Sequence, residues 1–574
     1  MLSVSIIFLY VAFTAYLTGY LALRGIGALF GAMSGSNSKA PSETPSGLPA
    51  PGLLQTVKAD GYLMAGLVFN TVYAQIFSLF YKVGLLANLL LLGICGMTAV
   101  VFGRQLAEGL RQGYRSASRG RRVFYLFLFL LFAYGTSRGI IHYDTGLYHA
   151  QSIRWIEEYG VVKGLGNLHC RLAYNSSSFS LSALYSFAFL GGPSYHCMAG
   201  FTALLLAGVC SEVTEAWKRK RLFAADIARL AGFYYLFIIF DEMVSPASDY
   251  FTVLTIFYIV IRYLELAEKG ERFWLPYGLL SLLGVYTMSL KLSAVPILLL
   301  TARPAAMLIR DKNIRGIIGC IGLGILILLP CFLRNILISG WMIYPFTAID
   351  LFDVDWKIPK SIADYDAREI RVWGRGIHDT ARFGESICQW FPGWFASQSA
   401  LDRAAILGAA AAVPASLAGF LWAVKRKEEI QRGLMLGAVT VSLSFLFWLF
   451  SAPLIRYGCV YVWLAAPVTF GALALRHIRT KTFWRPVYIL AGLLACYKIL
   501  ALGKEIAAGY TPEYLILQKD YENYQVENCR IQGIQFYYPS QGDQTGYRAF
   551  PSAPAIPSAE LRGNSLKDGF RYKK

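Results

Sequence analysis

Long apolar runs constrain this chain more than any other feature. About 14 of them are long enough to cross the roughly 30 Å of hydrocarbon in a bilayer, which takes about 20 apolar residues. The sequence therefore predicts an all-α polytopic membrane protein with about 12–14 transmembrane helices. The apolar cores lie at 3–23, 61–79, 83–103, 123–139, 195–211, 222–240, 250–266, 273–289, 291–303, 316–333, 404–424, 433–450, 457–475 and 486–502.

The composition agrees with a membrane protein. Of the 574 residues, 56% are hydrophobic and 16% are charged, whereas about 25% are charged in a typical soluble protein. These values exclude a disordered chain and a disulfide-stapled miniprotein. The net charge of +19 would suggest nucleic acid in a soluble protein, but here the positive charges form short clusters between apolar runs. We therefore expect a lipid bilayer as a partner and no nucleic acid.

Five basic clusters orient the predicted spans. When the spans are threaded in order, all five clusters fall on one side, which the positive-inside rule makes cytoplasmic. Regions 140–194, 334–403 and 503–574 then lie outside. The clusters are Arg104 to Arg122; Lys218, Arg219, Lys220 and Arg221; Arg303, Arg310, Lys312 and Arg315; Lys425, Arg426 and Lys427; and Arg476, Arg479, Lys481 and Arg485.

Three units follow from this threading. Residues 1–122 hold the first spans, a cytoplasmic linker at 25–57 and a basic loop; residues 123–502 form the transmembrane core; and residues 503–574 form an external tail or small cap. Within the core, 176–190 reads as a re-entrant or surface-lying helix. In the tail, the run 534–539 predicts one strand of a hairpin that ends near 547–550.

The segment richest in polar and titratable side chains follows the fourth predicted span on the external side. It reads Ile141-His142-Tyr143-Asp144-Thr145-Gly146-Leu147-Tyr148-His149-Ala150-Gln151. Asp144 is placed like an N-cap, and a helix over about 145–159 follows and stops at Gly160. Its apolar residues suit a membrane interface. The sequence thus predicts an interfacial amphipathic helix with a carboxylate at its start, and a plain capping role for Asp144 is an equal alternative.

This arrangement resembles the first external loop of the GT-C superfamily, multi-span glycosyltransferases that use polyprenyl-phosphate-linked sugars. The sequence motifs YDTGLYH, GLGNLH and NSSSF also resemble those of a bacterial family of GT-C-like membrane proteins. This resemblance covers residues from about 140 to 460. Three extra predicted spans precede the loop here, where most GT-C enzymes have one span before it. Further matching pieces are Ser245-Pro246-Ala247-Ser248-Asp249, Lys291-Leu292-Ser293, Arg334-Asn335 with Ser339-Gly340, Tyr344-Pro345, Asp355-Trp356-Lys357 and Arg456-Tyr457-Gly458.

The resemblance implies an inverting glycosyltransferase of a bacterial inner membrane. It would move a sugar from a polyprenyl-phosphate donor to a glycan, lipid or protein acceptor on the external, periplasmic face. Asp144 would be the general base, with His149 in a hydrogen-bonding or acid–base role. We expect the remaining substrate-binding residues to be Tyr148, Asn167, His169, Arg171, Asn175 and Asp249.

Three cations at the outer ends of apolar runs point to an anionic headgroup. Lys291, Arg334 and Arg456 stand against the positive-inside bias, and arginine suits bidentate phosphate contact. Snorkelling to the interface explains each of them singly, but a donor phosphate explains all three together. We expect them to bind that phosphate, with Tyr457 beside Arg456.

Two further features leave alternatives open. Asp241 and Glu242, in the next external loop, could join Asp144 around a divalent cation such as Mg or Mn, or could belong to a solvated loop. The five tryptophans and eight acids of loop 334–403 fit either a sugar-binding surface or a packed lid. His142, His149 and His169 lack the spacing of a zinc site.

Three other functions compete with the transferase. A transporter or flippase of lipid-linked glycans would place charges along a central path, whereas the charges here cluster outside. A glycan polymerase shares the large external loop and the basic residues. A non-catalytic assembly protein would make Asp144 dispensable.

Overall fold

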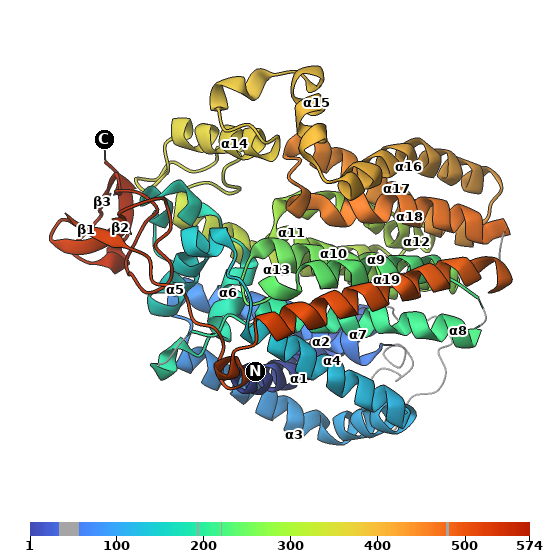
Figure 1. Ribbon diagram of the computed structural model, residues 1–574. Coiled ribbons are helices and arrows are strands. Elements are labelled where there is room, and N and C mark those ends of the chain that lie inside the picture. Colours follow the sequence, from blue (N-terminus) through green and yellow to red (C-terminus); the bar gives the residue numbers. More distant parts are fainter. Residues whose placement is uncertain (34–56, 192–193, 220, 478–480, 574) are drawn as a thin grey trace.

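A computed structural model describes residues 1–33, 57–191, 194–219, 221–477 and 481–573. The described chain is a bundle of long helices with a small β-rich cap at one end (Figure 1). Its helices are α1 (Leu2–Met33), α2 (Ala59–Phe80), α3 (Leu85–Ser116), α4 (Arg119–Ser137), α5 (Ala150–Glu158), α6 (Ser177–Leu184), α7 (Met198–Ser211), α8 (Glu215–Arg219), α9 (Ala224–Ile238), α10 (Ser248–Glu268), α11 (Trp274–Leu290), α12 (Ala302–Arg310), α13 (Ile314–Ser339), α14 (Lys360–Gly374), α15 (Ile387–Ser397), α16 (Ala400–Lys425), α17 (Glu429–Ser451), α18 (Ile455–His477) and α19 (Lys481–Ala508).

Within these described ranges, nine helices are long and apolar enough to cross a membrane. They are α1, α2, α3, α10, the continuous stretch Leu292–Arg310, α13, α16, α17 and α18. The other five predicted spans also coincide with helices, namely α4, α7, α9, α11 and α19. The all-α architecture is confirmed, and it is that of a polytopic helical membrane protein.

The basic loops meet at one end of the bundle, which we call the basic end. Arg121 pairs with Glu215, and Lys58 bridges Glu212 and Glu265 at 2.8 and 3.2 Å. A second group of contacts there joins Arg476 to Glu428 at 3.0 Å and places Arg303 against Gly433. Lys220 and Arg479, also expected here, lie outside the described residues.

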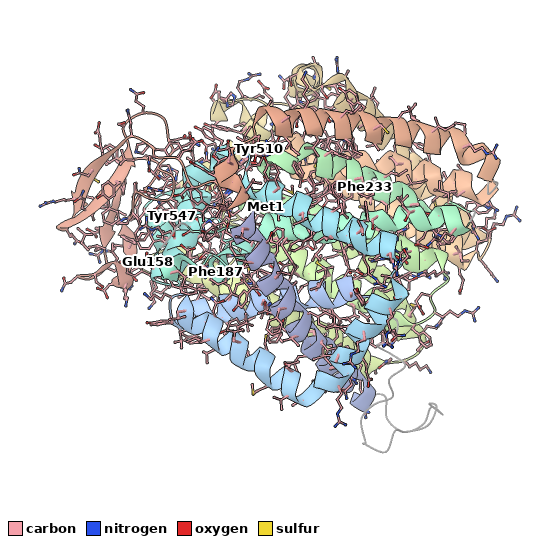
Figure 2. The ribbon with its side chains drawn as sticks, turned by 60° about the horizontal axis from the view of Figure 1, so that its bottom comes forward. Met1, Glu158, Phe187, Phe233, Tyr510 and Tyr547 are labelled. Atoms are coloured by element: carbon pink, nitrogen blue, oxygen red, sulfur yellow. The ribbon has the colours of Figure 1, made fainter. Side chains whose placement is uncertain are left out.

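The opposite end, which we call the cap end, holds α5, α6 and the strands (Figure 1). Met1 lies there too, because its amino group contacts Ser137 Oγ and the carbonyl oxygen of Tyr514. Figure 2 shows Met1 near Tyr510, Tyr547 close to the end of α5 at Glu158, and Phe233 further along the bundle.

The helix predicted at 145–159 forms, with two differences. Residues Thr145–His149 make a π-helical turn before α5, and the Asp144 side chain caps no backbone N–H. The expected interfacial position is wrong, because Ile153, Trp155 and Ile156 are at most 3% exposed and pack inside the protein. Gly160 ends the helix with φ +79°, a value that glycine adopts without strain.

Two other local expectations are confirmed only in part. Residues 25–33 of the expected linker are the end of α1, and residues 34–56 lie outside the described part of the chain. The segment 176–190 contains α6, whose eight residues are all buried. A helix of that length is too short to cross a bilayer, and protein covers it on every side.

The tail forms two antiparallel hairpins. Strand β1 (Val526–Ile531) pairs with β2 (Ile534–Pro539), and β3 (Ala559–Leu561) pairs with β4 (Phe570–Tyr572). The strand at 534–539 is therefore confirmed, but its hairpin partner precedes it rather than lying at 547–550. The tail has no core of its own, since Phe536 and Phe570 share one apolar cluster with Trp155, Leu165 and Trp341 of the two long loops.

Candidate functional site

Four charged residues from distant segments meet at the cap end, and we call them the charged cluster: Asp144, Asp249, Lys291 and Arg456. Asp144 precedes the π-helical turn, Asp249 is in the first turn of α10, Lys291 follows α11, and Arg456 is in the first turn of α18. All four were predicted as site residues, and the structure brings them together.

Backbone contacts between two loops hold Asp144 in position. The Ile140 N–H donates to the carbonyl oxygen of Asp241 at 2.7 Å, and the His142 N–H donates to Ser245 Oγ at 2.7 Å. Gly139 permits this approach, because a Cβ atom there would lie 2.0 Å from the Asp241 oxygen. The first external loop is thereby fixed to the segment that leads into α10 and Asp249.

A second glycine shapes the arginine side of the cluster. Gly458 has φ −145° and ψ 17°, which kinks α18 just after Arg456 and Tyr457. A Cβ atom at Gly458 would lie 2.3 Å from the Trp448 ring, so only glycine lets that ring pack against the backbone. The Trp448 indole N–H also donates to the carbonyl oxygen of Leu454 at 2.9 Å. The Arg456-Tyr457-Gly458 motif therefore has a structural reason for its glycine.

Within the charged cluster, Arg456 bridges both carboxylates. Its Nη2 lies 2.5 Å from Asp144 Oδ2 and its Nε lies 3.5 Å from Asp249 Oδ2. Lys291 contacts Asp249, and its Nζ lies 3.4 Å from the centre of the Tyr457 ring, within the range of a cation–π interaction. Two cations thus face two carboxylates.

The electrostatic environment keeps Asp144 ionised. Burial, the largest single effect, raises the pKa of its carboxyl group, but Arg456, His149 and His142 together outweigh burial, and the net effect lowers the pKa below its ordinary value. The Asp144 side chain is still 18% exposed and that of Arg456 33% exposed. A ligand at the surface can therefore reach both groups.

The two histidines beside Asp144 remain uncharged. Burial, with a smaller effect of Arg456, lowers the pKa of His142. Burial lowers the pKa of His149 to about 3, and its Nδ1 lies 3.1 Å from Thr145 Oγ1. At neutral pH His149 can accept or donate a hydrogen bond as a neutral ring. It cannot serve there as a charged acid.

His142 makes two contacts that a neutral ring cannot satisfy together. Its Nδ1 lies 3.1 Å from the Asp144 backbone N–H, and its Nε2 lies 2.5 Å from Nη1 of Arg456. Both partners are donors, whereas a neutral imidazole has one acceptor nitrogen. One of the two contacts is therefore donor against donor, at either the Asp144 N–H or the Arg456 guanidinium.

The other predicted residues lie around the cluster in supporting positions. Tyr148 packs edge-on against Tyr174, with ring centres 5.5 Å apart. Asn167 donates to the Trp356 carbonyl oxygen at 2.8 Å, which ties the first loop to the second. His169 accepts from the Arg171 N–H at 3.3 Å, and Arg171 pairs with Glu369 at 3.4 Å.

Arg334 is apart from the other expected phosphate ligands. It is 2% exposed, and its guanidinium donates to Asn175 Oδ1 at 3.0 Å and to Ser78 Oγ at 2.5 Å. Asn175 in turn donates to Asn335 Oδ1 at 2.9 Å. In this arrangement Arg334 joins α13 to α2 and to the first external loop.

The expected metal group does not assemble. Asp241 pairs with Arg138, and Glu242 accepts a hydrogen bond from Tyr250, so neither joins Asp144. Across the described ranges, no group of three or more His, Cys, Asp or Glu residues is arranged to hold a metal ion. Asp144, Asp241 and Glu242 therefore do not fit a divalent cation in this arrangement.

Sequence reasoning missed two sets of residues at the site. Asp366 of α14 is 1% exposed and accepts from Tyr174 at 2.6 Å, and burial raises the pKa of its carboxyl group. Tail residues 543–546 cover Gly146, whose carbonyl oxygen accepts from the N–H groups of Thr545 and Gly546 at 3.1 and 2.8 Å. The only signal in the sequence was the polarity of these two regions.

Loop 334–403 behaves mainly as a packed lid. Three of its five tryptophans, Trp341, Trp390 and Trp394, are at most 6% exposed. Trp373 is 44% exposed and lies 5.8 Å from the Arg171 guanidinium carbon. A surface cavity of about 500 Å³ lies between this loop and β4, lined by Asp353, Val354, Asp355, Lys357, Pro359 and Tyr572, and it contains no residue of the charged cluster.

Comparison with known proteins gives one match. The family model described as Domain of unknown function (DUF8201) matches residues 1–463, a range that includes every residue of the charged cluster. No curated protein and no solved structure matches the chain.

Proposed function

The chain belongs to the DUF8201 family, whose function is unknown, and from the geometry of its charged cluster we propose that it is an inverting membrane glycosyltransferase of the GT-C type. The donor is a sugar on a polyprenyl phosphate, and the acceptor is a hydroxyl group of a glycan, lipid or protein. The observation that supports the proposal is the 2.5 Å contact between Asp144 and Arg456, a carboxylate that can act as a base beside a guanidinium that can bind phosphate.

The reaction needs one base and one anion-stabilising group. The acceptor oxygen attacks the anomeric carbon of the sugar, and the bond from that carbon to the phosphate oxygen breaks. Asp144 takes the hydroxyl proton, and the polyprenyl phosphate leaves as an anion next to Arg456 and Lys291. A general base contributes roughly 10²–10⁴-fold, and charge stabilisation of the leaving group contributes on the order of 10²–10³-fold.

The position of the cluster supports a lipid-linked donor. Lys291 and Arg456 stand at the cap-end termini of apolar helices, where a phosphate at the membrane surface would reach them. The five basic loops gather at the opposite end, which the positive-inside rule makes cytoplasmic. We place the cluster on the external face of a bacterial inner membrane for these two reasons.

A donor assay on purified protein in lipid nanodiscs tests the function. A panel of undecaprenyl-phosphate sugars is supplied with and without Mg²⁺ or Mn²⁺, and release of free undecaprenyl phosphate is followed. We expect release by the wild type and less than 1% of it by Asp144→Asn. Asp241→Asn is the matched control, since that acid lies in the neighbouring loop and pairs with Arg138 outside the cluster.

Each rival function predicts a different result in this assay. A transporter or flippase moves the labelled donor across the bilayer without releasing undecaprenyl phosphate. A polymerase gives a ladder of product lengths rather than one added sugar. Equal release by wild type and Asp144→Asn would remove Asp144 from the reaction.

A further inference from the structure

The two carboxylates of the charged cluster hold Arg456 in different ways. Asp144 contacts Nη2 of the guanidinium from the exposed side, where its own side chain is 18% exposed. Asp249 faces Nε from the interior and is 10% exposed. An anion that arrives from solvent therefore meets Arg456 on the side that Asp144 occupies.

The Asp144 side chain has fewer partners than the Asp249 side chain, although its 2.5 Å contact with Arg456 is the shorter of the two. Arg456 faces His142 there, and one of the two donors around that ring has no acceptor, as described above. On the interior side Asp249 is fixed by Lys291, which in turn stacks over the Tyr457 ring at 3.4 Å. An anion that displaces Asp144 from Arg456 therefore breaks fewer contacts than one that displaces Asp249.

The donor phosphate, a diester of the lipid and the sugar, fits this exchange chemically. It offers several acceptor oxygens to a planar guanidinium, which binds phosphate in a bidentate manner. As a diester it carries one negative charge at neutral pH, as a carboxylate does, and Lys291 can supply a second positive contact. A phosphate in this position would also give an acceptor to Nη1, the nitrogen that now faces His142.

We propose that a lipid phosphate exchanges with Asp144 for Arg456, and that Asp249 is the positioning residue that keeps Arg456 and Lys291 in place during the exchange. This inference rests on the proposed function for the identity of the anion, and it deepens that function by stating how the base becomes available. Asp144 is paired with Arg456 as long as no donor is bound. Once the donor phosphate has taken its place beside Arg456, Asp144 is free to accept a proton.

The exchange makes opposite predictions for the two carboxylates. Asp144→Asn removes the internal competitor, so binding of the lipid phosphate should tighten by about tenfold. Asp249→Asn releases Arg456 and Lys291 from their anchor, so binding should weaken by about tenfold. Simple repulsion of the ligand by nearby negative charge would instead make both variants bind more tightly.

Equilibrium binding of undecaprenyl phosphate to protein in nanodiscs tests the exchange without requiring turnover. The wild type, Asp144→Asn and Asp249→Asn are compared, with Asp249→Glu as a rescue variant and Asp241→Asn as a control outside the cluster. Asp249→Glu should restore binding to within about threefold of wild type, since it returns the anchoring charge. A second arm uses inorganic phosphate, and the same order of affinities there shows that the phosphate group itself is recognised.

Specific results would overturn the inference. These are unchanged or weaker binding in Asp144→Asn, unchanged or tighter binding in Asp249→Asn, or no binding of either ligand by the wild type. If Asp144→Asn does not fold, the binding affinities of Asp249→Asn and of the rescue variant Asp249→Glu decide whether the inference holds. If the two variants change the binding affinity in opposite directions but no sugar is transferred, the exchange is supported and the glycosyltransferase is rejected. If sugar is transferred but the affinities do not change in opposite directions, the glycosyltransferase is supported and the exchange is rejected.

Discussion

Asp144 and Arg456 stand 312 positions apart in the chain, yet Oδ2 of the one lies 2.5 Å from Nη2 of the other. The pair connects the loop after α4 with the first turn of α18. Any change that moves either helix end therefore moves the base relative to the cation.

Arg456→Gln should lower the rate of sugar transfer by about 100-fold or more, because it removes the cation beside the leaving phosphate. Arg476→Gln provides a matched control in the same helix. The two arginines are 33% and 29% exposed, and each pairs with a carboxylate, but Arg476 lies at the basic end. Single-turnover rates in nanodiscs measure the difference, and equal losses in both variants would contradict a role specific to Arg456.

His149 should make the folded protein less stable in mild acid. The buried ring has a pKa of about 3 in the folded protein, against an ordinary value of 6.5, so between these values the unfolded chain binds the proton more strongly. The contribution of the neutral ring is complete above pH 6.5 and declines as the pH falls toward 3, at up to about 1.4 kcal/mol per pH unit. Thermal unfolding from pH 8 to pH 4 should therefore show a falling Tm.

The variant His149→Gln isolates this effect. It keeps a polar side chain near Thr145 but has no proton to gain, so its Tm should fall less steeply between pH 6.5 and 4. His378→Gln removes an exposed histidine and controls for the loss of a ring. A slope in His149→Gln as steep as that of the wild type would show that other groups cause the acid sensitivity.

Gly146→Leu should displace the tail from the site. A Cβ atom at Gly146 would already lie 2.7 Å from Tyr524 Oη and 2.9 Å from Gln544 Nε2, so a larger side chain must push residues 543–546 away. We expect faster cleavage of the tail in limited proteolysis and a loss of sugar transfer. Gly384→Leu is the control, since nothing lies within 4 Å of a Cβ atom there, and identical cleavage patterns would argue against the tail as a cover.

Tyr547→Phe should destabilise the junction between the tail and α5. The Tyr547 hydroxyl donates to Glu157 Oε2 at 2.6 Å, and the Glu157 side chain is 3% exposed, so the change leaves a buried acceptor short of a donor. The cost should be about 1–3 kcal/mol in the free energy of unfolding. Tyr538→Phe removes a comparable 2.7 Å bond to Glu527 at an exposed position and should cost less than about 0.5 kcal/mol.

The predicted spans coincide with observed helices because bilayer thickness fixes the length of an apolar run. The shortest of them, at 291–303, begins as a 3-10 helix at Leu292 and continues into α12. Pro296 lies inside that first stretch, where it cannot donate a backbone hydrogen bond. Length alone could not reveal this change of helix type.

The charged cluster could be found from sequence, but its pairing could not. Lys291 and Arg456 stood out because positive charge at the outer end of a span runs against the usual bias. Arg334 stood out for the same reason, yet it is buried between Ser78 and Asn175. Which cations share a site depends on how the helices pack, and no local pattern contains that information.

The buried position of α5 was missed for a related reason. Helical periodicity shows that Ile153 and Ile156 share an apolar face, but it does not show whether lipid or protein covers that face. Here α6 and the bundle cover Ile153 and Ile156. The tail covers Trp155, which packs against Phe550 and Phe570 with ring centres 4.9 and 5.9 Å away. The two tail rings lie 395 and 415 positions further along the chain than Trp155.

That separation has a consequence for biosynthesis. Gln151 donates to the carbonyl oxygen of Gly546, which is 395 residues later in the chain. Because ribosomes add about 5–20 residues per second, roughly 20 to 80 s pass between synthesis of the Asp144 segment and synthesis of the residues that cover it. During that interval the loop is without its cover, so the finished site can assemble only after α19 and the tail have been made.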